Sequence, residues 1–218
     1  MAEALRREHP RNLSMTNPRH TLRGRSGFTL IEILAVVAVM GIVAGMAVPS
    51  TTSMMRGYRL KGDAQGVNNL VALAKMRAAS RFSRARVYVD LGSNSFSLQV
   101  WDKAASSWVT DGGVARSSPG VTFGIGGLTT PPPNTQAAIG QSPLCKDGAG
   151  ADIANTACVT FNSRGMPVDN SVPPGGGVAG NNALYLTDGS AVYGITVTTT
   201  PLIKFWWSPI SDNKWVRQ

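Results

Sequence analysis

A single carboxylate, Glu32, stands within an apolar run of the chain. From Phe28 to Val48 no other side chain is ionisable. A charged side chain at the centre of a membrane helix costs roughly 2.5–3.5 kcal/mol on insertion scales, so a segment that serves only as an anchor is expected to omit it. We therefore expect Glu32 to have a cationic partner.

The run around Glu32 is long enough to cross a membrane. A helix rises about 1.5 Å per residue, so residues 28–48 span a hydrocarbon core of roughly 30 Å. Residues 1–27 hold six Arg and two Glu, which places +4 of the formal net charge of +9 before the run. By the positive-inside rule, this basic segment stays in the cytoplasm and the C-terminal part crosses the membrane.

The residues before the run, RGRSG followed by Phe28, resemble the class III signal of type IV prepilins and of the pseudopilins of type II secretion. The resemblance implies that a prepilin peptidase cuts between Gly27 and Phe28 and that Phe28 is then N-methylated. Residues 1–27 would be the leader, with Met1 or Met15 as its start. The positions that match are Gly27, Phe28, Thr29, Leu30, Ile31 and Glu32.

Cleavage after Gly27 would supply the partner that Glu32 needs. The new amine on Phe28 of one subunit can lie against Glu32 of a neighbouring subunit inside the membrane. Removing one member of such a pair leaves the other charge buried alone, at a cost of roughly 3–5 kcal/mol. Pairing would therefore set the axial offset between subunits, and this hypothesis gives Glu32 a role in assembly.

Two other interpretations of the N-terminal segment compete with this one. A conventional signal peptidase would use Gly45-Met46-Ala47 and leave Val48 as the first residue, although ordinary signal peptides have apolar regions of about 7–15 residues. A plain single-pass anchor would let Glu32 extend to the membrane interface. The first residue of the mature protein distinguishes cleavage before Phe28 from cleavage before Val48.

The remainder of the chain offers little catalytic chemistry. Both histidines, His9 and His20, precede Phe28, so the mature chain has no Ser-His or Cys-His pair and a metal site would need carboxylates alone. The aspartates are scattered at turns, where Asp commonly bonds the local backbone. We therefore expect no enzyme activity, no metal site and no cofactor.

The two cysteines, Cys145 and Cys158, both lie in the part of the chain that would be exported. In an oxidising compartment, a disulfide that closes a loop of about 14 residues stabilises the fold by roughly 3 kcal/mol. We expect this disulfide, with two buried thiols as the alternative.

A run of basic residues is the best candidate for contact with nucleic acid. Basic side chains at short intervals bind phosphates by releasing counterions, which is a weak and salt-sensitive mode. Trp206, Trp207 and Trp215 could stack bases in the same way that other single-strand binders do. The alternatives are a solvated helix face that meets anionic lipid headgroups and tryptophans that pack in the fold. The basic residues are Lys75, Arg77, Arg81, Arg84 and Arg86.

The residue pattern predicts one long helix over residues 28–82, with residues 28–48 in the membrane. Pro49 can kink a helix that packing carries onward, and Gly57, Gly62 and Gly66 weaken its middle by roughly 1 kcal/mol each. Apolar residues then recur at spacings of three and four, which is typical of one helix face laid against a sheet. They are Val67, Leu70, Val71, Ala74 and Ala78.

From Arg86 onward apolar and polar residues alternate, which predicts strands. Gly92-Ser93-Asn94 indicates a hairpin, and Asp188-Gly189 a tight turn between two later strands. Residues 112–181 contain fourteen Gly and eight Pro, so we expect long loops there. The predicted strands fall within residues 86–91, 95–101, 107–110, 114–123, 158–162, 183–188, 191–198 and 202–207, with an edge segment at 214–216.

This downstream half resembles the GspH/FimT family of minor pseudopilins. The similar segments are LVALAKMRAASRFSRARVYVDL, FNSRGMPVD and ALYLTDGSAVYGITVTTTPLIKFWW. The resemblance implies an α+β, pilin-like fold: a long N-terminal transmembrane helix packed on an antiparallel β-domain of two sheets, here residues 83–218. Some members bind DNA through a Gly-Arg-x-Arg motif, and at the matching place this chain reads Pro201-Leu202-Ile203-Lys204.

These inferences predict a minor pseudopilin, a structural subunit of a type II secretion pseudopilus or a type IV pilus. It would be a single-pass protein of the bacterial inner membrane, with its C-terminal domain in the periplasm. Its partners would be other pseudopilins or minor pilins, the prepilin peptidase/methyltransferase and the inner membrane. The alternatives are a DNA-binding minor pilin that acts in natural transformation and an adhesive pilin.

Overall fold

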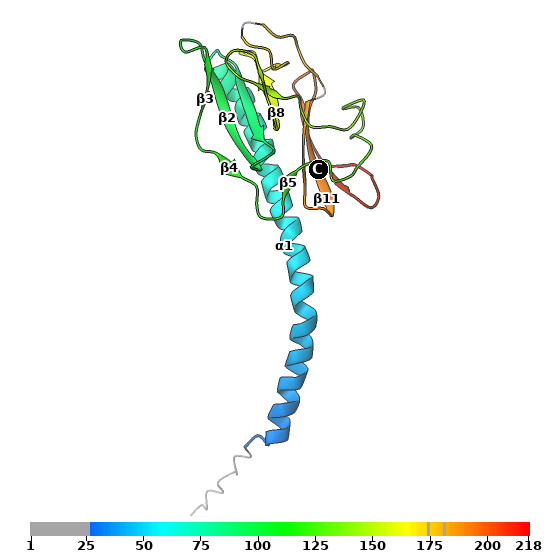
Figure 1. Cartoon of the computed structure of the whole chain (residues 1–218). Helices are drawn as coiled ribbons and strands as arrows, with labels where there is room; N and C mark the ends of the chain where they lie inside the picture. Colours follow the sequence, from blue (N-terminus) through cyan, green and yellow to red (C-terminus); the bar gives the residue numbers. More distant parts are fainter. Residues whose placement is uncertain (1–26, 174, 181) are drawn as a thin grey trace, which may run out of the picture. The chain divides into compact units, whose positions relative to one another are not determined.

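The computed structural model describes residues 27–173, 175–180 and 182–218, and for residues 46–53 it describes the backbone alone. The predicted leader, residues 1–27, therefore lies outside the described residues except for Gly27. The chain divides into two compact units, Met1–Met46 and Ala47–Gln218. Figure 1 shows the single long helix and the strands of the second unit.

The helix α1 runs from Leu30 to Ser80 and contains Pro49. Within the second unit it buries one stripe of side chains, each at most 1% exposed and spaced alternately by four and three residues. Three of the six are alanines, so the helix axis can approach the strands closely. The stripe consists of Leu60, Ala64, Val67, Val71, Ala74 and Ala78. It confirms four of the five predicted positions of the helix face, and the fifth, Leu70, is partly buried against the same core.

The first sheet has the strand order β3-β2-β1-β8-β9, with β4 also paired to β2. All its pairings are antiparallel, and β1 pairs with β2 across the predicted hairpin turn. Its strands are β1 (Ala85–Asp90), β2 (Ser95–Asp102), β3 (Ser107–Thr110), β4 (Ala115–Arg116), β8 (Thr156–Phe161) and β9 (Pro167–Val168).

The second sheet has the order β13-β12-β11-β10-β5 and is also antiparallel. Asp188-Gly189 makes the predicted tight turn between β10 and β11, with Gly189 at a φ of 85°. The strands are β5 (Thr122–Phe123), β10 (Asn182–Thr187), β11 (Ala191–Val197), β12 (Ile203–Pro209) and β13 (Val216–Arg217). A third, two-stranded sheet joins β6 (Cys145–Lys146) to β7 (Asp152–Ile153).

One hydrophobic core unites the buried stripe of α1 with both large sheets. Val87 of β1 and Val159 of β8 come from the first sheet, and Leu184 of β10 and Ile195 of β11 come from the second. Figure 1 shows this part of α1 beside both sheets. The helix and the two antiparallel sheets confirm the predicted α+β fold.

A loop between β5 and β6 covers the other face of the second sheet. Tyr185 on β10 is fully buried there, and its hydroxyl donates to Gln136 Oε1 at 2.7 Å. Trp215 packs against the Tyr185 ring and donates from its indole to the Thr130 carbonyl at 2.8 Å. The glycine- and proline-rich stretch is largely loops, as predicted, but it also forms the short strands β6, β7 and β9, which the sequence did not predict. Side chains from β10 and the C-terminal segment hold the part between β5 and β6 in place.

The disulfide between Cys145 and Cys158 is present, with an S–S distance of 2.02 Å, which confirms the predicted pair. It joins β6 to the central strand pair β1–β8 of the first sheet. Both cysteines are at most 1% exposed. The bond therefore fastens the β6–β7 segment onto the sheet from outside the main core.

The C-terminal end of α1 has an aromatic residue where glycine is usual. The Ser83 amide donates to the Ala78 carbonyl and the Phe82 amide to the Ala79 carbonyl, which is the Schellman arrangement. Phe82 occupies the left-handed position with a φ of 46°. A non-glycine residue pays about 1–2 kcal/mol there, and the Phe82 side chain is 76% exposed, so the core gains little from it.

We predict that replacing both Cys145 and Cys158 by Ala lowers the free energy of unfolding by about 3 kcal/mol, because the unfolded chain gains loop entropy. Urea unfolding of the full chain in detergent, followed by tryptophan fluorescence, measures this loss. Reductant should lower the stability of the wild-type protein to the same extent and leave the double variant unchanged. Equal sensitivity of both proteins to reductant would contradict the assignment.

We predict that Phe82→Gly raises the free energy of unfolding by up to about 1 kcal/mol, because glycine adopts the left-handed backbone without the steric cost. Phe82→Ala keeps the strained backbone and is the matched control, so it should give no gain. The same urea titration compares the two variants. A glycine variant no more stable than the alanine variant would show that no strain is stored at this position.

Candidate functional site

The predicted processing site lies directly before the start of α1. The Glu32 amide donates to the Thr29 carbonyl at 3.1 Å and lies 3.3 Å from the Thr29 hydroxyl oxygen. Thr29 is therefore the N-cap of the helix, and Glu32 is the third residue of its first turn. A Thr followed three residues later by Glu is the sequence signature of a capping box.

This position gives Glu32 a favourable local environment even in an isolated chain. The free amides at a helix N-terminus carry partial positive charge, and a carboxylate in the first turn gains about 0.3–1 kcal/mol from them. Thr29 was assigned no role by the sequence analysis, although its spacing to Glu32 is the signal that identifies it. A test of Glu32 in assembly must therefore separate pairing from helix capping.

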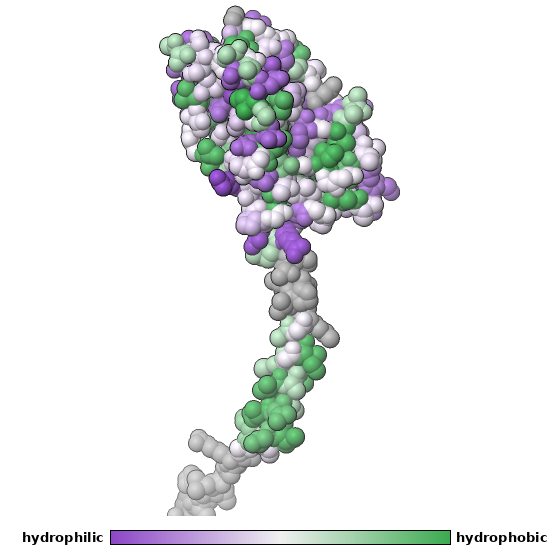
Figure 2. Space-filling model, in the orientation of Figure 1, coloured by the Kyte–Doolittle hydropathy of each residue, from purple (hydrophilic) through white to green (hydrophobic). Residues whose placement is uncertain are grey.

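The first unit exposes apolar side chains on all sides of the helix. Figure 2 shows green, hydrophobic patches along this part of the helix on the face in view. The large apolar residues from Phe28 to Val43 are all exposed. Phe28 is 79% exposed, and even the least exposed large side chain in this stretch, Val36, is 46% exposed. Patches of this extent on a protein mark contact with other proteins or with lipid.

Within the part of the chain that the structure describes, no helix combines the length and apolar character required to span a membrane. The predicted span, residues 28–48, ends in residues 46–48, whose side chains lie outside the described set.

The basic residues predicted to contact nucleic acid have partners within the chain. Lys75 donates to the Pro201 carbonyl at 3.1 Å. Arg77 Nε lies 3.0 Å from Asp111 Oδ2, an ion pair without hydrogen-bond geometry, and Arg81 Nη2 lies 3.7 Å from Asp111 Oδ1. The exposed half of the basic run is thus partly neutralised by one carboxylate.

Arg84 and Arg86 are buried and hold the fold together. Arg86 is 2% exposed, donates to Gln99 Oε1 and to the Lys146 carbonyl, and lies 4.0 Å from the centre of the Trp108 ring. Burial lowers the Arg86 pKa to about 10, which leaves it charged at neutral pH. Arg84 is 8% exposed and donates to the Ser171 carbonyl. The structure does not bring the five basic residues onto one exposed face.

The predicted tryptophans are also part of the packing. Trp206 is 7% exposed and donates to Thr196 Oγ1 at 2.9 Å, and Trp207 packs against the main core. Trp215 lies on Tyr185. None of these three rings is arranged as an open platform for a base.

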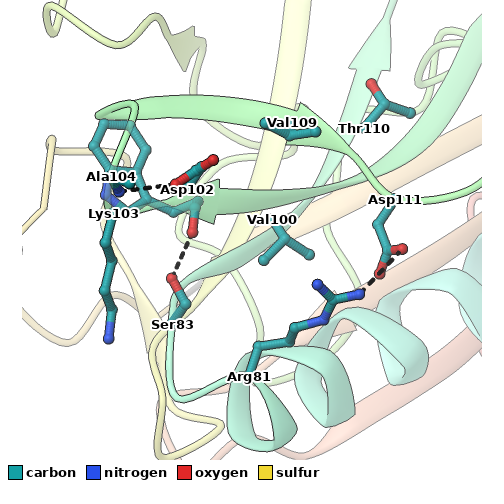
Figure 3. Close-up of a pocket in the computed structure, with 10 residues that line it drawn as sticks. Arg81, Ser83, Val100, Asp102, Lys103, Ala104, Val109, Thr110 and Asp111 are labelled. Atoms are coloured by element: carbon teal, nitrogen blue, oxygen red, sulfur yellow. Dashed lines mark hydrogen bonds and ion pairs between the residues drawn. The ribbon is translucent and has the colours of Figure 1, made fainter.

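A cavity of about 520 Å³ lies between the end of α1 and strands β2 and β3. Figure 3 shows Arg81 directed at Asp111 on its wall and the Ser83 hydroxyl bonded to a backbone oxygen. Asp102, also on the wall, accepts from the amides of its own turn at Ala104 and Ala105. Asp111 is thus ion-paired and Asp102 is hydrogen-bonded to the backbone of its own turn.

No group of three or more His, Cys, Asp or Glu residues that could hold a metal ion occurs among the described residues. The cysteines are joined in the disulfide. The described residues thus present an exposed apolar helix segment and a folded β-unit.

The model of the prokaryotic N-terminal methylation motif matches residues 22–48. Two solved structures of the minor pseudopilin EpsH from the type II secretion system of Vibrio cholerae are similar to the chain, with TM-scores of 0.41 and sequence identities of 10% and 12%. Each similarity covers 67% of this chain, and 95% or 92% of the EpsH chain. No curated protein matches the sequence.

The methylation motif includes Gly27, Phe28 and Glu32, the three residues singled out by the sequence resemblance. Behind it the chain folds as one helix with two antiparallel sheets. The chain therefore carries a prokaryotic N-terminal methylation motif on an α+β fold.

Proposed function

We propose that this chain is a minor pseudopilin, a structural subunit of a type II secretion pseudopilus or of a type IV pilus. The observation that carries the proposal is the placement of Glu32. It is the only ionisable side chain between Phe28 and Val48, it lies five positions into a processed chain that begins at Phe28, and it sits within the methylation motif.

Before assembly, residues 28–48 would hold the chain in the bacterial inner membrane with residues 83–218 in the periplasm. The prepilin peptidase/methyltransferase would remove residues 1–27 and methylate Phe28. The exposed apolar side chains from Phe28 to Val43 support such a location, because no described part of the chain covers them and lipid or a partner helix would remove them from water.

In the assembled filament, the amine of Phe28 from one subunit would pair with Glu32 of the next. Both charges are costly in an apolar medium, so a contact that neutralises them favours one axial offset over all others. Thr29 would support the pair by fixing the first turn of α1, on which Glu32 is carried. The apolar side chains would then supply the packing with other pseudopilins or minor pilins.

The chain would act mechanically, as a subunit of the filament. In the cavity at the end of α1, Arg81 pairs with Asp111 and Asp102 accepts from backbone amides. The β-unit would present its loops to other subunits or to exported cargo. The chain would act as a substrate of the processing enzyme and catalyse no reaction itself.

We predict that the mature protein begins at Phe28 and carries one methyl group on its terminal nitrogen. Mass spectrometry of the N-terminal peptide, from protein produced together with a prepilin peptidase, measures both properties. The same protein produced without the peptidase should keep its leader. A mature terminus at Val48 would instead support a conventional signal peptide and overturn the filament proposal.

We predict that Glu32→Ala is processed normally but fails to enter filaments, because the amine of the neighbouring Phe28 loses its counter-charge. Thr29→Ala is the matched control: it removes the helix cap, at a cost of about 1 kcal/mol, and keeps the carboxylate. Immunoblots of sheared filaments and of membranes compare the two variants. Equal loss of assembly in both would show that Glu32 acts through the helix end alone.

A further inference from the structure

We propose that a pocket beside Phe82 is a docking site for an acidic segment of a partner protein. The pocket has a volume of about 500 Å³, and its wall includes Phe82, Trp101, Lys103, Val168 and Pro173. A volume of this size suits a ligand or a few side chains of a partner. The site involves neither Glu32 nor the apolar segment, so it does not depend on the proposed mode of assembly.

The first observation is that the backbone conformation of Phe82 is unfavourable in free energy for a non-glycine residue. Its backbone lies in the left-handed region, which glycine would occupy without strain, and its ring is 76% exposed. Strained backbone of this kind concentrates at functional sites, where another interaction gives the residue its use. Exposed aromatic rings are enriched among the residues that dominate protein interfaces.

The second observation is that the same strained residue positions a cation. The Phe82 carbonyl accepts a hydrogen bond from Lys103 Nζ at 2.7 Å, and Lys103 is itself exposed. The ammonium has three donors, so this bond directs the group and leaves donors for a carboxylate. Lys103 also lines the pocket, so the exposed ring and the cation lie at the mouth of one cavity.

The charges of the wall determine the kind of partner. Of the described residues that line the pocket, two are basic, Arg84 and Lys103, and none is acidic. Arg84 is buried, donates to the Ser171 carbonyl and lies beside the Asp169 carboxylate, so Lys103 is the cation that a partner would meet. A carboxylate beside an apolar or aromatic side chain complements this combination, since the ammonium takes the charge and the exposed Phe82 ring takes the apolar group.

A nucleic acid fits this surface less well than an acidic peptide. A phosphate backbone is bound by a strip of cations that each release a counterion, whereas Arg77 and Arg81 already share Asp111 and Arg86 is buried. The neighbouring cavity also presents Asp102 and Asp111, which would repel a continuous polyanion. A short acidic segment needs only one cation, and Lys103 is an exposed one.

In the test, random heptapeptides displayed on phage are selected for binding to the full chain in detergent. Fluorescence anisotropy then measures the affinity of the chain for the consensus peptide. We expect a consensus with at least one Asp or Glu and an aromatic or large apolar residue. Lys103→Gln should weaken its binding about tenfold, which corresponds to about 1.4 kcal/mol. Lys214→Gln removes the same charge from an exposed site elsewhere and should leave binding unchanged.

Phe82→Gly separates binding from folding. This variant should bind the selected peptide about tenfold more weakly. The thermal unfolding midpoint of the variant should stay at or above that of the wild-type protein. A consensus without acidic residues, equal effects of Lys103→Gln and Lys214→Gln, or full binding by the Phe82→Gly variant would each overturn the proposal. So would a short DNA duplex that binds more tightly than the peptide and loses affinity with Lys103→Gln.

Discussion

The second unit depends on the contact between one stripe of α1 and two sheets at once. Each residue of the stripe is almost fully buried, and its three alanines keep the helix close to the strands of both sheets. At native packing density an added methylene has no space, so a larger residue at Ala64, Ala74 or Ala78 would push the helix from at least one sheet. This packing also fixes the C-terminal end of α1, and so it positions the residues from that end which line the two pockets.

Features with local causes could be predicted from the sequence, and those with distant causes could not. The spacing of apolar residues predicted the helix face, and turn residues predicted both hairpins, because each signal lies within a few residues of its effect. Arg86 was grouped with its basic neighbours, yet its burial depends on the Lys146 carbonyl, which comes from strand β6, far along the chain. The sequence also could not predict that the loop between β5 and β6 is held over Tyr185. The two residues that contact the Tyr185 ring and hydroxyl, Trp215 and Gln136, lie far after it and far before it in the chain.

The two ends of α1 illustrate different uses of helix termini. At the N-terminus Thr29 satisfies the first turn, and the negative charge of Glu32 is where the helix dipole favours it. At the C-terminus the Schellman hydrogen bonds form, but with Phe82 in the place that suits glycine. The N-terminal end has the residues that helix capping favours, whereas the C-terminal end does not. Such exceptions are expected where a residue is retained for function and not for stability.

The edge of β10 shows how the fold limits association through its backbone. Beyond the two residues paired with β5, Gln141 continues the ladder with its side chain: its amide donates to the Tyr185 carbonyl at 2.8 Å, and its oxygen accepts from the Tyr185 amide at 3.0 Å. The Ser142 amide then donates to the Ala183 carbonyl. An extended strand from another molecule finds these groups already taken, so crowded copies of the domain are protected here from the edge-to-edge growth that leads to aggregates.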